Sequence, residues 1–82
     1  MQVEFSNSFL KNLKKLDNKL QDVFKKKIKQ IAIDPTIGIP LKHNLRGYYK
    51  MRVLVYRIIY SFDESSIYFY ALNHRKNVYK KL

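Results

Sequence analysis

Cationic side chains occupy alternating positions inside an apolar and aromatic stretch, residues 48–79. The polar side chains of this stretch that could take part in chemistry are those of Lys50, Arg52, Arg57, His74, Arg75 and Tyr79. Successive side chains of a strand point to opposite faces, so such a run gives one face to a core and the other to an anionic ligand. If the chain is an enzyme, this inventory suits RNA cleavage: the 2′-OH attacks the adjacent phosphate, cations stabilise the developing charge, and a nearby side chain transfers protons.

No other catalytic or metal-binding pattern competes with this stretch. The sequence contains no glycine-rich phosphate loop, no HExxH motif and no pair of carboxylates at active-site spacing. Two histidines and no cysteine argue against a metal site. We therefore predict neither a metal nor a cofactor.

Length and charge set the broad class of the protein. The 82 residues make one domain, 1–82, and a hydrophobic fraction of 46% allows a packed core. The 17 Lys and Arg residues exceed the 6 Asp and Glu residues, for a formal net charge of +11. Such an excess indicates a polyanionic partner: nucleic acid, an acidic protein or an anionic membrane surface. The alternative is a solvated basic surface with no specific partner.

The lengths of the apolar runs and the N-terminal residues indicate the cellular location of the protein. No run approaches the roughly 20 apolar residues that span a membrane. Residues 1–4 lack the basic and apolar segments of a secretory signal. We expect a cytoplasmic protein with no membrane partner.

The first half of the chain has the pattern of a strand followed by two helices. Gln2 to Phe5 alternates polar and apolar residues, as a strand with one buried face does. A helical apolar stripe at steps of three or four is formed by Phe9, Leu13, Leu16, Leu20, Phe24, Ile28 and Ile31. Ser6-Asn7-Ser8 can cap its start, Asp17-Asn18 can form the turn of a helical hairpin, and Asp34-Pro35 ends it.

Three strands are predicted in the second half, after a connector from Thr36 to Gly47. They are Tyr48 to Val53, Tyr56 to Phe62, and Ile67 to Asn73. The order β-α-α-β-β-β predicts an α+β domain: a mostly antiparallel four-stranded sheet with an N-terminal helical hairpin packed on one face. We expect residues 76–82 to form a short helix or a tail.

The turn between the first two of these strands decides which side chains share a face. If Leu54-Val55 is that turn, Arg52 lies opposite Arg57, on the same side as Lys50. Two-residue turns favour Asn or Gly, and Val at positive φ is costly, so this turn is unusual. The core side would then carry Tyr49, Met51, Val53, Tyr56, Ile58, Tyr60, Ile67, Phe69 and Ala71. The cationic side would also carry Tyr68, Tyr70, Leu72 and His74.

Opposed arginines suggest that this cationic side binds an anion. Like charges directly opposite each other cost up to roughly 1 kcal/mol per pair, so folding alone would not select them. Tyr68 and Tyr70 could stack on bases of an unpaired nucleic acid while the cations bind its phosphates. The alternative is that these are ordinary outward-facing cations on an exposed sheet.

Three ordered motifs resemble the RelE/ParE toxin superfamily, on its RelE side. They are residues 41–53, which include LRGYYKMRV, residues 56–60, which read YRIIY, and residues 74–79, which read HRKNVY. The basic helical hairpin before them also fits the family, so the resemblance spans nearly the whole chain. It departs from the family pattern at Leu54-Val55, where a Gly-Asp-like turn is usual.

The resemblance implies a toxin of a type II toxin–antitoxin pair. RelE-like toxins enter the ribosomal A site and cleave mRNA there by metal-free attack of the 2′-OH. The implied partners are the ribosome, mRNA and a small acidic antitoxin that covers the basic face. ParE-like members share the fold and inhibit DNA gyrase by binding it, which is the alternative function. A nucleic-acid-binding module without chemistry is a third possibility.

Roles for the site residues also follow from the resemblance. Lys50 and Arg52 match a basic pair that binds the RNA backbone and assists proton transfer. Arg57 matches the arginine that stabilises the phosphate in the transition state. Arg75 matches the arginine near the leaving oxygen, and Tyr79 the tyrosine that stacks on a base or assists catalysis.

One further candidate is His74, which directly precedes Arg75. Some relatives use a histidine in this region as a proton carrier. We take His74 as a catalytic candidate whose alternative is a structural role.

Overall fold

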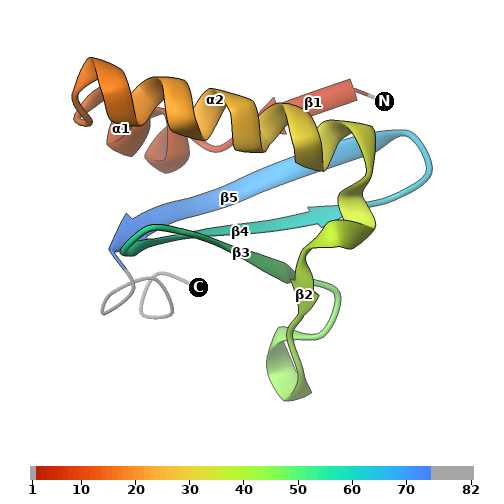
Figure 1. The fold of residues 1–82 in the computed structure, drawn as a ribbon. Coiled ribbons are helices and arrows are strands. Elements are labelled where there is room, and N and C mark those ends of the chain that lie inside the picture. Colours follow the sequence, from red (N-terminus) through yellow and green to blue (C-terminus); the bar gives the residue numbers. More distant parts are fainter. Residues whose placement is uncertain (1, 75–82) are drawn as a thin grey trace.

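A five-stranded sheet with two helices on one of its faces forms the fold of this computed structural model, which describes residues 2–74 (Figure 1). The strands are β1 (Gln2–Phe5), β2 (Ile39–Pro40), β3 (Tyr49–Val53), β4 (Tyr56–Phe62) and β5 (Ser66–His74). The helices are α1 (Asn7–Lys14) and α2 (Asn18–Ile33), and the connector contains two 3-10 turns, η1 (Pro35–Ile37) and η2 (His43–Leu45). The predicted α+β class is confirmed. Residues 75–82, with Arg75, Tyr79 and the predicted C-terminal helix or tail, lie outside the described residues.

The prediction of four strands is wrong by one, because the connector adds the short strand β2. The strand order is β1-β5-β4-β3-β2, with β1 parallel to β5 and every other pair antiparallel. Ile39 and Pro40 pair with Lys50 and Tyr49 at the edge of the sheet. Proline is tolerated on an edge strand because no neighbour there needs its missing N–H. Because the strand contains this proline and has only two residues, its sequence has the pattern of a loop.

Side-chain caps define the two helices where the sequence predicted them. The Ser6 hydroxyl accepts a hydrogen bond from the Phe9 N–H at 3.0 Å, and an Asp17 carboxylate oxygen accepts one from the Leu20 N–H at 2.9 Å. Helix α2 ends at Ile33, directly before Asp34-Pro35. The helical hairpin is therefore confirmed. Across residues 2–74, neither helix has the length and apolar content that a membrane-spanning helix needs.

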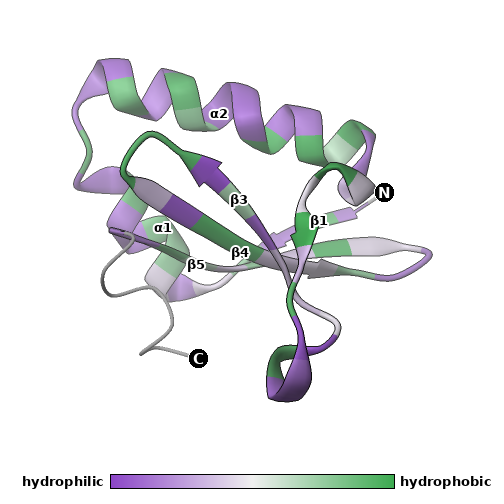
Figure 2. Ribbon diagram, turned by 60° about the horizontal axis from the view of Figure 1, so that its bottom comes forward, coloured by the Kyte–Doolittle hydropathy of each residue, from purple (hydrophilic) through white to green (hydrophobic). Residues whose placement is uncertain are grey.

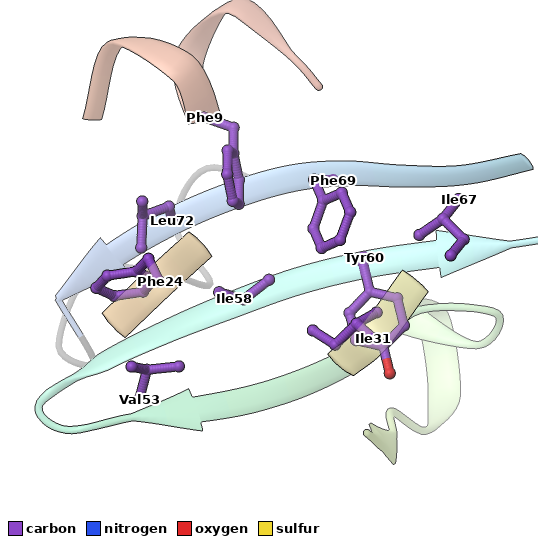
Figure 3. Close-up of a cluster of buried hydrophobic side chains, with 9 residues drawn as sticks. All are labelled: Phe9, Phe24, Ile31, Val53, Ile58, Tyr60, Ile67, Phe69 and Leu72. Carbon is purple, nitrogen blue, oxygen red and sulfur yellow. The ribbon is translucent and has the colours of Figure 1, made fainter. Parts of the chain in front are cut away.

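The main core fills the space between these helices and the sheet (Figure 3). Its buried members are Phe9, Phe24, Ile31, Val53, Ile58, Tyr60, Ile67, Phe69 and Leu72. Burying each such apolar side chain contributes about 1.5–3 kcal/mol, so this layer is the principal support of the fold. The predicted core face of β3 and β4 is confirmed, since Tyr49, Met51 and Tyr56 also pack against it.

A bulge in β5 corrects the predicted faces at the end of that strand. Ile59 pairs with Ala71 and Tyr60 with Phe69, so Tyr70 is an extra residue between two normal pairs. An extra residue reverses the alternation beyond it. Leu72 therefore joins the main core, and Ala71 packs with Ile59 on the opposite face. The predictions that placed Ala71 in the core and Leu72 on the cationic side are both wrong for this reason.

The two hairpin turns form where the sequence placed them. In the β4–β5 loop, an Asp63 carboxylate oxygen accepts hydrogen bonds from the N–H groups of Ser65 and Ser66, each at 2.9 Å, and these bonds lower the pKa of Asp63. In the β3–β4 turn, Val53 pairs with Tyr56, which leaves a two-residue loop. Of its two residues only Leu54 has positive φ, at 59°. One positive φ at the first position is the type II′ pattern, which favours glycine there.

Replacing Leu54 by glycine is therefore expected to stabilise the protein. A residue with a Cβ in the left-handed region costs about 1–2 kcal/mol, and glycine avoids that cost while losing some chain entropy. The Leu54 side chain is 64% exposed, so little burial is lost. We expect the free energy of unfolding in urea to rise by about 0.5–1 kcal/mol. The matched change Val55→Gly, at negative φ, should lower it; a gain at Val55 and a loss at Leu54 would contradict this view of the turn.

Candidate nucleic-acid interface

The predicted basic side chains of β3 and β4 meet on the outer face, which is the face of the sheet turned away from α1 and α2. Arg52 pairs with Arg57, and Lys50 pairs with Ile59, whose side chain packs on that face. Figure 2 shows hydrophilic segments on both β3 and β4. The predicted grouping of Lys50, Arg52 and Arg57 is confirmed, and neither helix covers it (Figure 1).

The opposed arginines give the outer face its chemical character. Directly opposed residues on an antiparallel pair have Cβ atoms about 4.5–5.5 Å apart, so their positive charges repel. Arg52 is exposed, whereas Arg57 is half-buried and its Nη1 atom is fully buried. A phosphate seated between the two guanidinium groups would offset the repulsion through charge-assisted hydrogen bonds.

Tyrosine rings lie on the same face as these cations. The rings of Tyr48 and Tyr70 are 5.2 Å apart in an edge-to-face contact, and that of Tyr68 lies 6.4 Å from Tyr70. The Ser61 hydroxyl lies 3.4 Å from the Tyr70 hydroxyl, which ties this ring to β4. The predicted placement of Tyr68 and Tyr70 with the cations is confirmed. Tyr70 is 37% exposed, so its ring can stack on a base.

Two further residues of this face were not among the predicted site residues. Tyr48 packs with Leu41 over the small cluster of Ile59 and Ala71, and its alternation with Lys50 could have identified it. Asn73 pairs with Arg57, and it reaches this face only because the bulge reverses the alternation of β5. No signal in the sequence marks that bulge.

His74 does not join the cationic face, so this prediction is wrong. The bulge places it on the helix side, where its ring makes an edge-to-face contact with Tyr56 at 6.1 Å. It lines a pocket with Asn12, Lys15 and Leu16 of the helical hairpin and with Tyr56, Leu72 and Asn73 of the sheet. A catalytic role for His74 stays a prediction. Among residues 2–74, no three His, Asp or Glu side chains are grouped so that they could hold a metal.

Comparisons with known proteins identify the family. A family model described as the ParE toxin of the type II toxin–antitoxin system parDE matches residues 3–79. No curated protein sequence matches the chain.

Solved structures share the fold over most of the chain. The YoeB/ParE toxin from Agrobacterium tumefaciens has a TM-score of 0.79 and 18% identity, covering 90% of this chain and 98% of that one. The YoeB dimer from Staphylococcus aureus has a TM-score of 0.76 and 25% identity, covering 90% and 95%. The toxin in the intact RelBE toxin–antitoxin complex of E. coli has a TM-score of 0.76 and 19% identity, covering 89% and 94%. The chain thus belongs to the ParE toxin family of type II toxin–antitoxin systems, within the RelE/ParE toxin superfamily.

Proposed function

We propose that this chain is a cytoplasmic toxin that cleaves mRNA on the ribosome without a metal ion. The observation that carries the proposal is the opposed pair Arg52 and Arg57 on the face that also carries exposed Tyr70, a face that no helix covers. Folding gains nothing from opposed arginines, whereas an RNA phosphate would bind both. The single-stranded bases next to that phosphate would stack on the tyrosine rings.

The reaction requires charge stabilisation and two proton transfers. The 2′-oxygen attacks the adjacent phosphorus and loses its proton, while the bond from phosphorus to the 5′-oxygen breaks and that oxygen gains a proton. The products are a 2′,3′-cyclic phosphate and a 5′-hydroxyl. Arg57 stabilises the phosphate charge of the transition state, and Lys50 and Arg52 bind the RNA backbone and assist proton transfer. Arg75, near the leaving oxygen, and Tyr79, against a base, stay predictions.

Gyrase inhibition is the second candidate function, because the matching family model is that of ParE. One experiment separates the two candidates. The purified chain is added to translating ribosomes, with cleavage of the mRNA as the readout, and in parallel to a DNA gyrase supercoiling assay. We expect mRNA cuts and undiminished supercoiling; loss of supercoiling without cuts would replace this proposal by the alternative.

An acidic antitoxin is the expected protein partner. Solved neighbours include complexes of toxins with their antitoxins, such as RelBE from E. coli and YoeB–YefM from Staphylococcus aureus. The formal net charge of +11 on this chain would attract an acidic protein over long range. We expect a short acidic reading frame to adjoin the gene for this chain.

Association with that antitoxin is expected to slow as salt rises. Electrostatic steering weakens as the Debye length falls from about 10 Å at 0.1 M to about 3 Å at 1 M ionic strength. Stopped-flow mixing should therefore show an association rate constant that falls at least about tenfold over this range. The variant Lys50→Gln should have a shallower salt dependence than Lys26→Gln, an exposed position on α2. A rate constant indifferent to salt would argue against an acidic partner.

A further inference from the structure

Three side chains with hydrogen-bond donors form a row across the outer face. Arg52 pairs with Arg57 and Arg57 pairs with Asn73, so one residue from each of β3, β4 and β5 stands in register. Arg57 Nη1 and Asn73 Nδ2 are both buried, and neither has a hydrogen-bond partner within the part of the chain that the structure describes. Two donors, from residues that pair across β4 and β5, are therefore withdrawn from water.

The amide of Asn73 is oriented by a residue distant in sequence. Asn12 Nδ2, on α1, donates to the Leu72 carbonyl oxygen and to Asn73 Oδ1, both at 2.9 Å. A carbonyl oxygen can only accept, so the atom of Asn12 that contacts it must be the amide nitrogen. The atom of Asn73 that meets the same nitrogen must then be its oxygen. This network leaves the Nδ2 donor of Asn73 without a partner among residues 2–74 and available to an acceptor.

Leaving these donors without an acceptor would be costly. A buried polar group that lacks its hydrogen bond loses its hydration without compensation, and the loss is larger for a charged group such as Arg57. Buried polar groups in native proteins nearly always have a hydrogen-bond partner. Two buried donors without one therefore indicate that an acceptor binds there. A single anionic oxygen, or two oxygens of one phosphate, would satisfy both donors.

We propose that Asn73 is a second phosphate-binding residue of the RNA site, that it acts together with Arg57, and that Asn12 is its positioning residue. This inference rests on the proposed function and specifies the ligand group, a phosphodiester oxygen of single-stranded RNA. A phosphodiester fits better than a carboxylate of an acidic protein because tyrosine rings, which stack on bases, lie on the same face. Asn73 adds a donor without adding charge to a row that already holds two arginines.

The test uses an RNA trinucleotide whose riboses are 2′-O-methylated, so that it binds and is not cut. It is titrated into the full chain labelled with ¹⁵N, and the side-chain amide signals of Asn73 and the guanidinium signals of Arg57 are followed. We expect both to shift, and we expect a trinucleotide with neutral methylphosphonate links to leave them in place. The assignment would be overturned if the chemical shifts of Asn73 did not change. Equal shifts with the neutral trinucleotide or with an acidic peptide would also overturn it.

Variants separate binding from folding. Asn73→Ser should weaken trinucleotide binding about tenfold, because a hydrogen bond to a charged group is lost, and Asn73→Asp should weaken it further. Gln30→Glu, which makes the same amide-to-carboxylate change at an exposed position of α2, should change it less than about twofold. Asn12→Ala should weaken binding and also reduce the shift of the Asn73 amide signals, an effect that lost stability alone would not produce. Binding by Asn73→Ser within twofold of wild type, at an unchanged melting temperature, would overturn the proposal.

Failure of this inference is distinguishable from failure of the proposed function. A wild-type chain that binds the trinucleotide through Asn73 and does not cut mRNA on ribosomes would keep the phosphate site and overturn the nuclease. A chain that cuts mRNA equally well with Asn73→Ser would keep the nuclease and overturn the phosphate site.

Discussion

Replacing Arg57 by alanine is expected to lower the rate of ribosome-dependent mRNA cleavage about 100- to 1,000-fold. Arg57 is half-buried and stands in register between Arg52 and Asn73, so a charged donor is already present on the outer face before the substrate arrives. A donor fixed in advance costs no reorganisation during the reaction, which is why removing one has an effect of this size. Single-turnover cleavage of a ribosome-bound mRNA measures it.

Two control variants show whether the effect of Arg57→Ala is specific. Arg57→Lys keeps the charge and loses the fork of donors, so an intermediate rate is expected. Lys26→Ala, at an exposed position on α2, should leave the rate within about twofold. The melting temperature of Arg57→Ala should not fall sharply, because the change removes a like-charge pair. Cleavage by Arg57→Ala at the wild-type rate would contradict the role assigned to this arginine.

The variant Gly38→Ala is expected to lose about 2–3 kcal/mol of stability. A Cβ at Gly38 would lie 2.9 Å from Tyr60 Cζ and closer still to the Tyr60 hydroxyl. That hydroxyl cannot move freely, since it donates to the Pro35 carbonyl at 2.6 Å and accepts from the Gly38 N–H at 3.0 Å. Burial raises the pKa of Tyr60, so its proton remains available for this bond at neutral pH. Urea unfolding should show the loss as a lower midpoint.

A double-mutant cycle tests the physical cause of that loss. Tyr60→Phe removes the hydroxyl and leaves the Gly38 N–H and the Pro35 carbonyl without their partner, which should cost about 1–3 kcal/mol. Adding Gly38→Ala to Tyr60→Phe should then cost less than Gly38→Ala costs in the wild type, because the clash with the hydroxyl is gone. Additive losses would show that this contact does not explain the effect.

Much of the fold follows from local patterns in the sequence. The stripe that includes Phe9 and Phe24 predicted the helical hairpin, and Asp17 predicted its turn, because caps and periodicity are short-range properties. Strand β4 was predicted with its observed bounds. The alternation in β3 and β4 predicts that Arg52 lies opposite Arg57, as observed. The cationic part of the site can therefore be predicted from the sequence.

The other features of the fold and site depend on the pairing of strands, for which the sequence carries no local signal. The bulge at Tyr70 carries no glycine, yet it reverses every later side chain of β5. It removes His74 from the predicted site and brings in Asn73, which simple alternation would have placed in the core. Strand β2 exists only through its pairing with β3, and its proline suggested a loop.

Three destabilising features of this toxin fold lie on or next to the outer face. The positive φ of Leu54, the opposed arginines and the unpaired donors of Arg57 and Asn73 all reduce stability and lie on or next to the outer face. Such costs persist where a function requires them. The tight contact of Gly38 with Tyr60 lies elsewhere, in the core, and supports the part of the connector that leads into β2.

Mapping of mRNA ends on translating ribosomes shows whether this chain is a ribosome-dependent nuclease. We expect cuts within the codon in the A site, with 5′-hydroxyl ends, that need the ribosome and disappear with Arg57→Ala. A 2′-deoxy substitution at the mapped position should abolish the cut there, because it removes the nucleophile. The absence of cuts with the wild-type chain would show that it is not this nuclease, and equal cuts with Arg57→Ala would show that Arg57 is not part of its site.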